Sequence, residues 1–282
     1  MTNEEKAVLG VFESEGIDRF ASSPVEKLPV TLERHMPQGT KSAVVFLVPY
    51  FVRDDGPRNI SRYAVSRDYH KYFGLLGEKV REAFSDMGSP CFAKVMSDLS
   101  PLDEKSSALS LGLGVRGKNR LLINDKYGSY VFIGAVFSDA DLSLFSDGLV
   151  SPNGECMGCG KCVRACPTFL SGGGTCLSEL TQKKRLDEAD EEILTECVKN
   201  SVWGCDICQE VCPHNKDIAE TPVRFFHEAR IPYITTELLD SMTDVEFAER
   251  AYAWRGRKVM SDLSPLDEKS SALSLGLGVR GK

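Results

Sequence analysis

The 282-residue sequence is 42% hydrophobic and 27% charged, a balance typical of a globular protein with enough apolar side chains for a sizeable core. Its formal net charge of −7 argues against a sequence-blind nucleic-acid binder, which needs a broad basic face, but leaves a local basic patch open. The N-terminal segment MTNEEKAVLG lacks the basic-then-apolar order of a signal peptide, and the longest apolar run, Ala43–Val52, is too short to span a bilayer. We therefore predict a cytoplasmic protein with no membrane partner.

The first half of the chain alternates between strand and helix patterns. After an N-terminal helix and loop, Ser42–Val48 is a continuous apolar run typical of a buried strand. From Tyr72 to Met87 apolar residues recur every three or four positions, which predicts an amphipathic helix closed by Gly88. This alternation predicts an α/β (α+β) domain over residues 1–148. Further short strands are expected at Phe92–Met96, Leu121–Asn124 and Tyr130–Phe137.

The second half contains most of the cysteines and ends in an unusual tail. We predict a cysteine-rich domain over residues 149–220 and a helical C-terminal extension over residues 221–257. Residues 258–282 repeat residues 94–118 letter for letter. Repeat proteins carry divergent copies in arrays of three or more, so a recent duplication or a sequence-assembly error explains this single copy better than a functional module. We expect a non-native tail and leave it out of the functional argument.

Two cysteine runs carry the clearest chemical signal. CMGCGKCVRACP has the spacing C-x2-C-x2-C-x3-C-P, with which bacterial ferredoxins wrap a [4Fe–4S] cluster, and CDICQEVCP repeats part of it. In two-cluster ferredoxins the last cysteine of each run binds the other cluster. That rule assigns Cys156, Cys159, Cys162 and Cys212 to cluster 1, and Cys166, Cys176, Cys205 and Cys208 to cluster 2.

The alternative for these cysteines is a pair of zinc sites, because C-x2-C pairs also bind zinc. The triple spacing and the two Cys-Pro endings favour iron–sulfur, so we expect an electron-transfer module. The two remaining cysteines, Cys91 and Cys197, stand apart and are predicted to be buried thiols that act as small hydrophobic side chains.

Gly112, Gly114 and Gly117 match the dinucleotide fingerprint G-x-G-x-x-G. That fingerprint requires a strand before it and a helix after it, whereas a helical stretch precedes these glycines and a strand follows them. We therefore expect no nicotinamide site. The glycines would instead allow a tight turn or the close approach of a flat cofactor.

Two further segments contain candidate functional residues, one just after the predicted strand Phe92–Met96 and one at the start of the predicted helix. Asp98, in S-D-L-S-P, is either the N-cap of a helix starting near Pro101 or a proton donor at a redox site. SRYAVSRDYHKYF suits a ligand that bears phosphate or amide groups, and the alternative is a solvated helix start with Tyr69 packed inward. Its candidate ligand-binding residues are Arg62, Arg67, Tyr69 and His70.

The order of these motifs resembles the epoxyqueuosine reductase family, which depends on cobalamin and is related to reductive dehalogenases. The resemblance covers about residues 42–217 and is closest to short members of the family. It rests on SRYAVSRDYHKYF, on D-x-S-P-L-x-E at Asp98–Glu104, and on GLGVRGKNRLLIN, YGSYVFIGAVFSD and WGCDICQEVCP.

The resemblance implies a cobalamin-binding N-terminal domain followed by a ferredoxin-like double [4Fe–4S] domain. Such an enzyme reduces the epoxide of epoxyqueuosine in tRNA to the alkene of queuosine, with clusters that reduce the corrinoid. Asp98 matches the family's acid and would protonate the departing oxygen. The implied partners are tRNA and an electron donor of the flavodoxin or ferredoxin type. The predicted cofactor-binding residues are Arg62, Arg67, Tyr69, His70, Gly112, Gly114 and Lys118.

Two other functions remain open from the sequence. One is a cobalamin and iron–sulfur reductase of another small electrophile, because kinship of fold does not fix a substrate. The other is a non-catalytic [4Fe–4S] electron carrier whose first domain binds no corrinoid.

Overall fold

The computed structural model describes residues 1–250 except for residues 55, 152–153, 171–173, 184–185 and 198–200. The chain forms two compact units whose segments alternate along the sequence. The predicted domain boundaries at residues 148 and 220 remain predictions. The first unit comprises Met1–Val52, Tyr69–Cys159 and Pro213–Phe225; the second comprises Arg53–Asp68, Gly160–Cys212 and the residues from Phe226 onward.

The first unit is built on a four-stranded sheet in which every neighbouring pair is antiparallel. Its order is β1-β2-β6-β3. All residues of β2 are buried, because helices cover both faces of the sheet and a strand in that position must be apolar throughout. The strands are β1 (Phe20–Pro24), β2 (Ser42–Pro49), β3 (Ala93–Met96) and β6 (Val131–Ser138).

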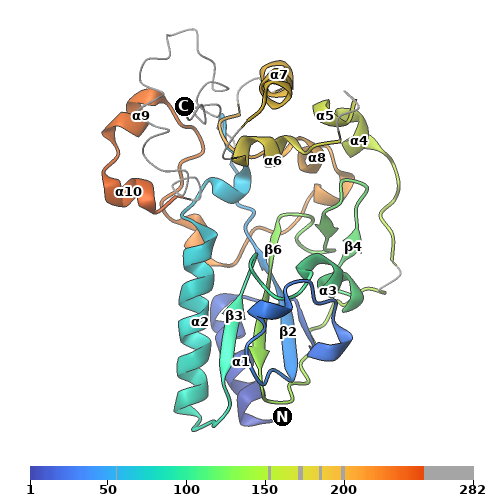
Figure 1. The fold of residues 1–282 in the computed structure, drawn as a ribbon, viewed down its shortest axis with the longest axis vertical. Helices are drawn as coiled ribbons and strands as arrows, with labels where there is room; N and C mark the ends of the chain where they lie inside the picture. The colour runs from blue at the N-terminus through green and yellow to red at the C-terminus, as the bar shows by residue number, and fades with distance from the viewer. Residues whose placement is uncertain (55, 152–153, 171–173, 184–185, 198–200, 251–282) are drawn as a thin grey trace. The chain divides into compact units, whose positions relative to one another are not determined.

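The helices α1 (Asn3–Glu15) and α2 (Tyr69–Asp86) cover one face of this sheet (Figure 1). Phe46 of β2 packs there between the rings of Phe12 and Phe73, with ring centroids 4.9 and 6.0 Å away. Gly134 lies opposite Phe46 in the register, and a Cβ at this glycine would meet the Phe73 and Phe46 rings at 2.4 and 2.7 Å. The missing side chain of Gly134 therefore makes room for the two rings.

The opposite face of the sheet is covered by α3 (Glu104–Ser110) and the segment that follows it. Val45 and Leu47 of β2 alternate with Phe46 along the strand and contribute to this second core, with Ala108 of α3. A two-stranded ladder of β4 (Val115–Arg116) and β5 (Leu122–Ile123) lies beyond α3 in the sequence. The first unit thus has three layers, with one sheet between helices.

The predicted strand at 42–48 and the predicted helix from Tyr72 onward are confirmed. The expectation of a loop before the first strand is wrong at β1, a short edge strand whose sequence FASSP carries no apolar alternation and ends in proline. Helices pack on the sheet, but the sheet contains no parallel pair of strands. This arrangement corresponds to the α+β form of the predicted class.

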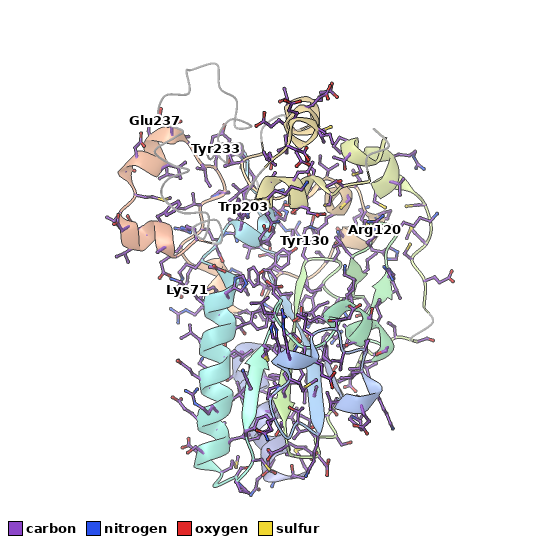
Figure 2. All side chains as sticks on the ribbon, viewed as in Figure 1. Lys71, Arg120, Tyr130, Trp203, Tyr233 and Glu237 are labelled. Atoms are coloured by element: carbon purple, nitrogen blue, oxygen red, sulfur yellow. The ribbon has the colours of Figure 1, made fainter. Side chains whose placement is uncertain are left out.

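The second unit is helical in the described residues. One core joins Ile60 and Val65 to Trp203 and Ile234, and Trp203 is labelled in Figure 2. The main helices are α4 (Lys161–Ala165), α5 (Pro167–Leu170), α6 (Leu177–Gln182), α7 (Glu188–Cys197), α8 (Ile207–Glu210), α9 (Thr236–Ser241) and α10 (Asp244–Ala248).

The predicted helical C-terminal extension contains two separate helices, α9 and α10, among its described residues. Thr243 starts a new helix through a capping box, in which its side chain accepts the backbone N–H of Glu246 and the Glu246 side chain accepts that of Thr243. A single helix across this position would lose both bonds. The duplicated tail at 258–282 lies outside the described residues. Within 1–250, apart from the gaps given above, no helix is both long and apolar enough to cross a membrane.

Candidate functional site

Tyr69, His70 and Asp98 come together in the first unit, where α2 begins and shortly after β3 ends. The Tyr69 hydroxyl donates a hydrogen bond to Asp98 Oδ2, and His70 Nε2 lies 3.0 Å from the same oxygen. The Tyr69 ring stacks on the rings of His70 and Phe132, with centroids 4.1 and 4.3 Å away. The side chains of His70 and Asp98 are 54% and 47% exposed, so this cluster is open to a ligand.

Asp98 does not cap the following helix. Asp103 takes that role, because its Oδ1 accepts the Ser106 backbone N–H at 3.0 Å and α3 begins directly after it. Asp98 instead occupies a left-handed backbone conformation, with φ of 64°. The alternative that the sequence left open for Asp98 as an N-cap is therefore wrong.

Glu104 is a residue of this neighbourhood to which the sequence analysis gave no role. Its Oε1 is buried and has no hydrogen-bond partner among the residues that the structure describes. Burial, and then the nearby charge of Asp98, raise the pKa of Glu104 to about 8. The only signal in the sequence was its place at the end of D-x-S-P-L-x-E, where a glutamate in the first turn of a helix is an ordinary choice.

Close contacts with the chain's own backbone explain why glycine stands at positions 112 and 114. Gly112 has φ of 74°, and a Cβ there would lie 2.4 Å from the Val150 carbonyl oxygen. At Gly114 a Cβ would lie 2.6 Å from the carbonyl oxygen of Ile123. α3 precedes the glycines and β5 follows them, which confirms the order that argues against a dinucleotide fingerprint. Lys118 is exposed between β4 and β5, and binding of a cofactor by these three residues remains a prediction.

Arg62 and Arg67 lie in the second unit, and each has a carboxylate partner there. Arg62 Nη1 lies 3.8 Å from Asp54 Oδ2, and Arg67 Nη2 lies 2.8 Å from Glu228 Oε2. These ion pairs give both guanidinium groups a structural role within their own unit. Binding of a cofactor by Arg62 and Arg67 remains a prediction.

All ten cysteines are free of disulfides. The four predicted ligands of cluster 2 belong to the second unit: Cys166 follows α4, Cys176 is the N-cap of α6, and Cys205 and Cys208 lie on either side of the start of α8. Burial raises the pKa of the Cys205 thiol to about 12, and Cys208 and Cys176 are near enough to add to this rise. Of the predicted cluster 1 ligands, Cys156 and Cys159 belong to the first unit, and Cys162 and Cys212 to the second.

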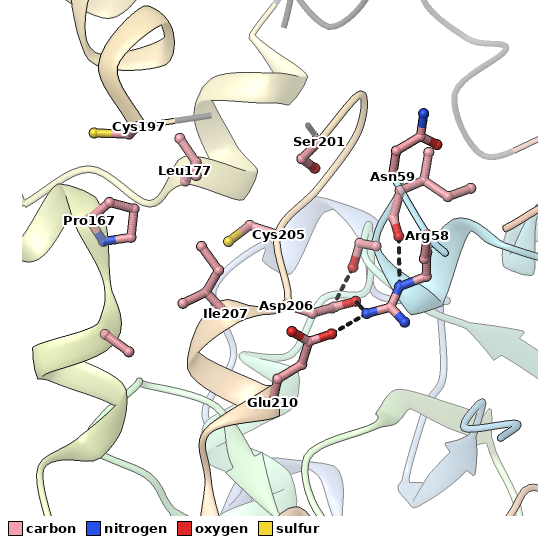
Figure 3. A pocket seen from close by; sticks show the side chains of 13 residues that line it. Arg58, Asn59, Pro167, Leu177, Cys197, Ser201, Cys205, Asp206, Ile207 and Glu210 are labelled. Atoms are coloured by element: carbon pink, nitrogen blue, oxygen red, sulfur yellow. Dashed lines mark hydrogen bonds and ion pairs between the residues drawn. The ribbon is translucent and has the colours of Figure 1, made fainter. Parts of the chain in front are cut away.

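A cavity of about 440 Å³ lies beside Cys205 in the second unit (Figure 3). Pro167, Leu177 and Ile207 form apolar parts of its wall. On its polar side the buried carboxylate of Asp206 accepts a hydrogen bond of 2.6 Å from Ser61 Oγ, and Arg58 forms ion pairs with Asp206 and Glu210.

These features fit an iron–sulfur cluster. Of the predicted ligands, the disulfide-free thiol of Cys205 lines this partly apolar cavity, and it resists ionisation until a cationic centre stabilises the thiolate. The exposed group of Tyr69, His70 and Asp98 offers stacked rings and polar tips, and binding of a corrinoid there remains a prediction.

The prediction that Cys91 and Cys197 are buried is wrong, because both are only half-buried. Cys91 follows the turn at Gly88 and precedes β3, where the chain is near the surface. Cys197 ends α7, packs against Leu194 and also lines the cavity beside Cys205.

Residues 155–215 match the family model of a 4Fe-4S double cluster binding domain. The matched segment contains all eight predicted cluster ligands. This match confirms iron–sulfur as the chemistry of the cysteine runs and disfavours the zinc alternative.

The chain is also similar to epoxyqueuosine reductases. It is 36% identical over 194 residues to the epoxyqueuosine reductase of Leadbetterella byssophila, a match that covers 64% of this chain and 61% of the relative. The chain thus spans about three fifths of the length of this curated relative. The resemblance predicted from the motifs is confirmed.

Solved structures share the fold. The epoxyqueuosine reductase of Streptococcus thermophilus matches with a TM-score of 0.71 at 21% identity, covering 100% of this chain and 83% of that one. A structure of an epoxyqueuosine reductase with an epoxyqueuosine-modified tRNA-Tyr stem loop matches with a TM-score of 0.68 at 21% identity, covering 91% and 78% of the two chains.

Proposed function

We propose that this chain is an iron–sulfur and cobalamin-dependent reductase that converts epoxyqueuosine in tRNA to queuosine. The observation that supports it best is the open group of Tyr69, His70 and Asp98 in a chain whose residues 155–215 match a double cluster domain. The similarity to epoxyqueuosine reductases points to the substrate. A cytoplasmic location and an electron donor of the flavodoxin or ferredoxin type belong to the same proposal.

The chemistry requires two electrons and two protons, because an epoxide becomes an alkene and its oxygen leaves as water. Two [4Fe–4S] clusters, each of which passes one electron, match this demand. Cobalamin, when bound, supplies the nucleophilic metal centre that iron–sulfur clusters do not provide. Tyr69, His70 and Lys118 are proposed to help hold it.

Asp98 is proposed to deliver a proton to the departing oxygen. Its carboxyl group is exposed and so can reach a substrate. Its neighbours Tyr69 and His70 both contact Oδ2 and so fix its orientation. Because Asp98 pairs with His70 as a carboxylate, it must take up a proton before this step; the positioned carboxylic acid then contributes about 10²- to 10⁴-fold to a reaction that is limited by proton transfer.

The test is to purify the chain anaerobically after growth with cobalamin and to measure iron, the corrinoid spectrum and the reduction of epoxyqueuosine-containing tRNA and of other small electrophiles. The proposal expects two [4Fe–4S] clusters and a retained corrinoid. Full clusters without any corrinoid binding would instead support an electron carrier. A retained corrinoid with reduction of another electrophile, but not of the tRNA, would support the second alternative.

A further inference from the structure

The turn that presents Asp98 is fixed on both sides. The Leu99 N–H donates to the Ser97 carbonyl at 2.8 Å, which closes a three-residue turn around Asp98. Ser97 Oγ donates to the carbonyl of Ile133 in β6 at 2.9 Å, and His35 Nδ1 lies 3.0 Å from the Leu99 carbonyl oxygen. With φ of 64° at its centre, this is the rare form of the three-residue turn, and it persists only where surrounding contacts hold it.

Glu104 provides such a contact at the centre of the turn. Its carboxyl group lies close enough to the Asp98 backbone N–H for that amide to lower its pKa, while its Oε1 is buried without a hydrogen-bond partner among the described residues. The capping of α3 does not need Glu104, because Asp103 receives both the N–H and the hydroxyl of Ser106. The Glu104 carboxyl is thus a buried polar group beside the backbone of Asp98.

We propose that Glu104 is the positioning residue for Asp98: its buried carboxyl holds the strained turn in the conformation that directs the Asp98 side chain toward Tyr69 and His70. This inference rests on the proposed function only where it concerns turnover. It goes beyond that function because it assigns a role to Glu104, a residue that the proposed reaction does not use.

The charge state of Glu104 agrees with this role. Its pKa is raised to about 8, first by burial and then by the carboxylates of Asp98 and Asp103, which face it from the turn and from the preceding residue; the Asp98 amide opposes this rise. Near neutral pH the group is a neutral acid that accepts the amide hydrogen bond without placing a second charge beside Asp98. Ionisation above about pH 8 adds that charge and weakens the arrangement.

The experiment uses the intact chain with its clusters and follows the imidazole titration of His70 by NMR. Only four histidines are present, and a His70→Asn variant identifies the resonance. Three variants are compared with the wild type. Glu104→Gln keeps an acceptor oxygen, Glu104→Leu removes it, and Asp98→Asn removes the carboxylate that His70 faces. Turnover is measured on the same samples across pH.

We expect the His70 midpoint in Glu104→Leu to fall by about half a pH unit, as in Asp98→Asn, because the ion pair with Asp98 is lost. Glu104→Gln should keep the wild-type midpoint. Turnover should fall about 10²-fold in Glu104→Leu, and the alkaline loss of rate near pH 8 should disappear in Glu104→Gln.

A wild-type His70 midpoint in Glu104→Leu would overturn the inference. If Glu104→Leu does not fold, the Glu104→Gln variant decides. An alkaline loss of rate in Glu104→Gln that equals that of the wild type would overturn the inference. The NMR measurement needs neither tRNA nor corrinoid. The two claims can therefore fail separately. If Glu104→Leu loses the ion pair but the wild-type protein shows no turnover, the positioning role is retained and the proposed function is rejected.

Discussion

At the scale of single residues, Asp98 has an unusual set of neighbours for an exposed carboxylate. It contacts the Tyr69 hydroxyl and the His70 imidazole through its side chain, and the Glu104 carboxyl lies beside its backbone amide. An exposed ion pair alone contributes little to folding stability. A strained turn at Asp98 therefore indicates that the orientation of its side chain matters more than the stability it adds. This is the physical basis for treating Asp98 as the acid.

Replacing Asp98 with Asn tests that role. Asn keeps the shape and tolerates the left-handed backbone, but it cannot supply a proton. Iron content and corrinoid binding should therefore stay at wild-type levels, while turnover falls about 10²- to 10⁴-fold. Asp86→Asn, at the far end of α2, serves as the control and should not change turnover. Wild-type rates in Asp98→Asn at every pH would rule out the acid role.

Glu104 also predicts how stability depends on pH. Its pKa is raised from 4.5 to about 8 in the folded chain, so between these values the folded state keeps a proton that the unfolded state has lost. Its contribution is fully present at low pH and is lost as the pH rises through about 8. Between about pH 6 and about pH 9, the apparent melting temperature of the wild type should therefore fall more than that of Glu104→Gln. Glu78→Gln, at an exposed site of α2, should follow the wild type.

At the scale of elements, Gly134 tests the packing of the sheet. Alanine there would place a Cβ 2.4 Å from the Phe73 ring and 2.7 Å from the Phe46 ring. Overpacking of this kind costs about 1 to 3 kcal/mol. Gly74→Ala is the matched control, because no atom lies within 4 Å of its Cβ position in α2 and helix propensity favours alanine by about 1 kcal/mol. Equal unfolding midpoints for the two variants would contradict the described packing.

The β4–β5 ladder carries the local basic patch that the acidic composition left open. Arg116 and Arg120 are exposed, and Figure 2 labels Arg120 in the loop between the strands. Burial, and then the positive charge of Arg116, lower the pKa of Lys105 on α3, with Arg120 adding to the effect. Such a group of cations suits a phosphate backbone.

Reversing these charges in the double variant Arg116→Glu and Arg120→Glu should weaken binding of the tRNA about tenfold or more. It should also reduce the slope of log affinity against log salt by about 1 to 2, since each lost phosphate contact removes about 0.7 to 0.9. Lys27→Glu with Arg81→Glu changes the charge equally at exposed sites elsewhere in the first unit. An identical salt slope in both double variants would mean that the patch does not face the tRNA.

Sequence patterns predicted the elements that are apolar over a full period, such as β2 and α2, because burial dictates their composition. They did not predict β1, an edge strand without alternation, or the break at Thr243, where local capping outweighs the helical period. In the site, the spacing of the cysteines is set by the geometry of cluster ligation, so the ligand pattern could be recognised directly in the sequence. Glu104 could not, because its significance comes from burial and from a contact with a backbone six residues earlier.

At the scale of the whole molecule, the sheet-based unit holds the proposed acid Asp98, and the helical unit holds six of the eight predicted cluster cysteines. Neither chemistry is sufficient alone, because clusters deliver single electrons and an acid delivers only protons. The proposed enzyme needs both, together with a corrinoid. Its defining property is therefore a complete two-electron turnover by one chain.

The most direct measurement is mass spectrometry of nucleosides from epoxyqueuosine-containing tRNA after anaerobic incubation with the reduced, cobalamin-loaded chain. We predict that epoxyqueuosine is converted to queuosine, with loss of one oxygen atom, and that Asp98→Asn and cluster-free protein each leave the epoxide intact. Unchanged epoxyqueuosine after incubation with wild-type protein that contains both clusters and bound corrinoid would contradict it.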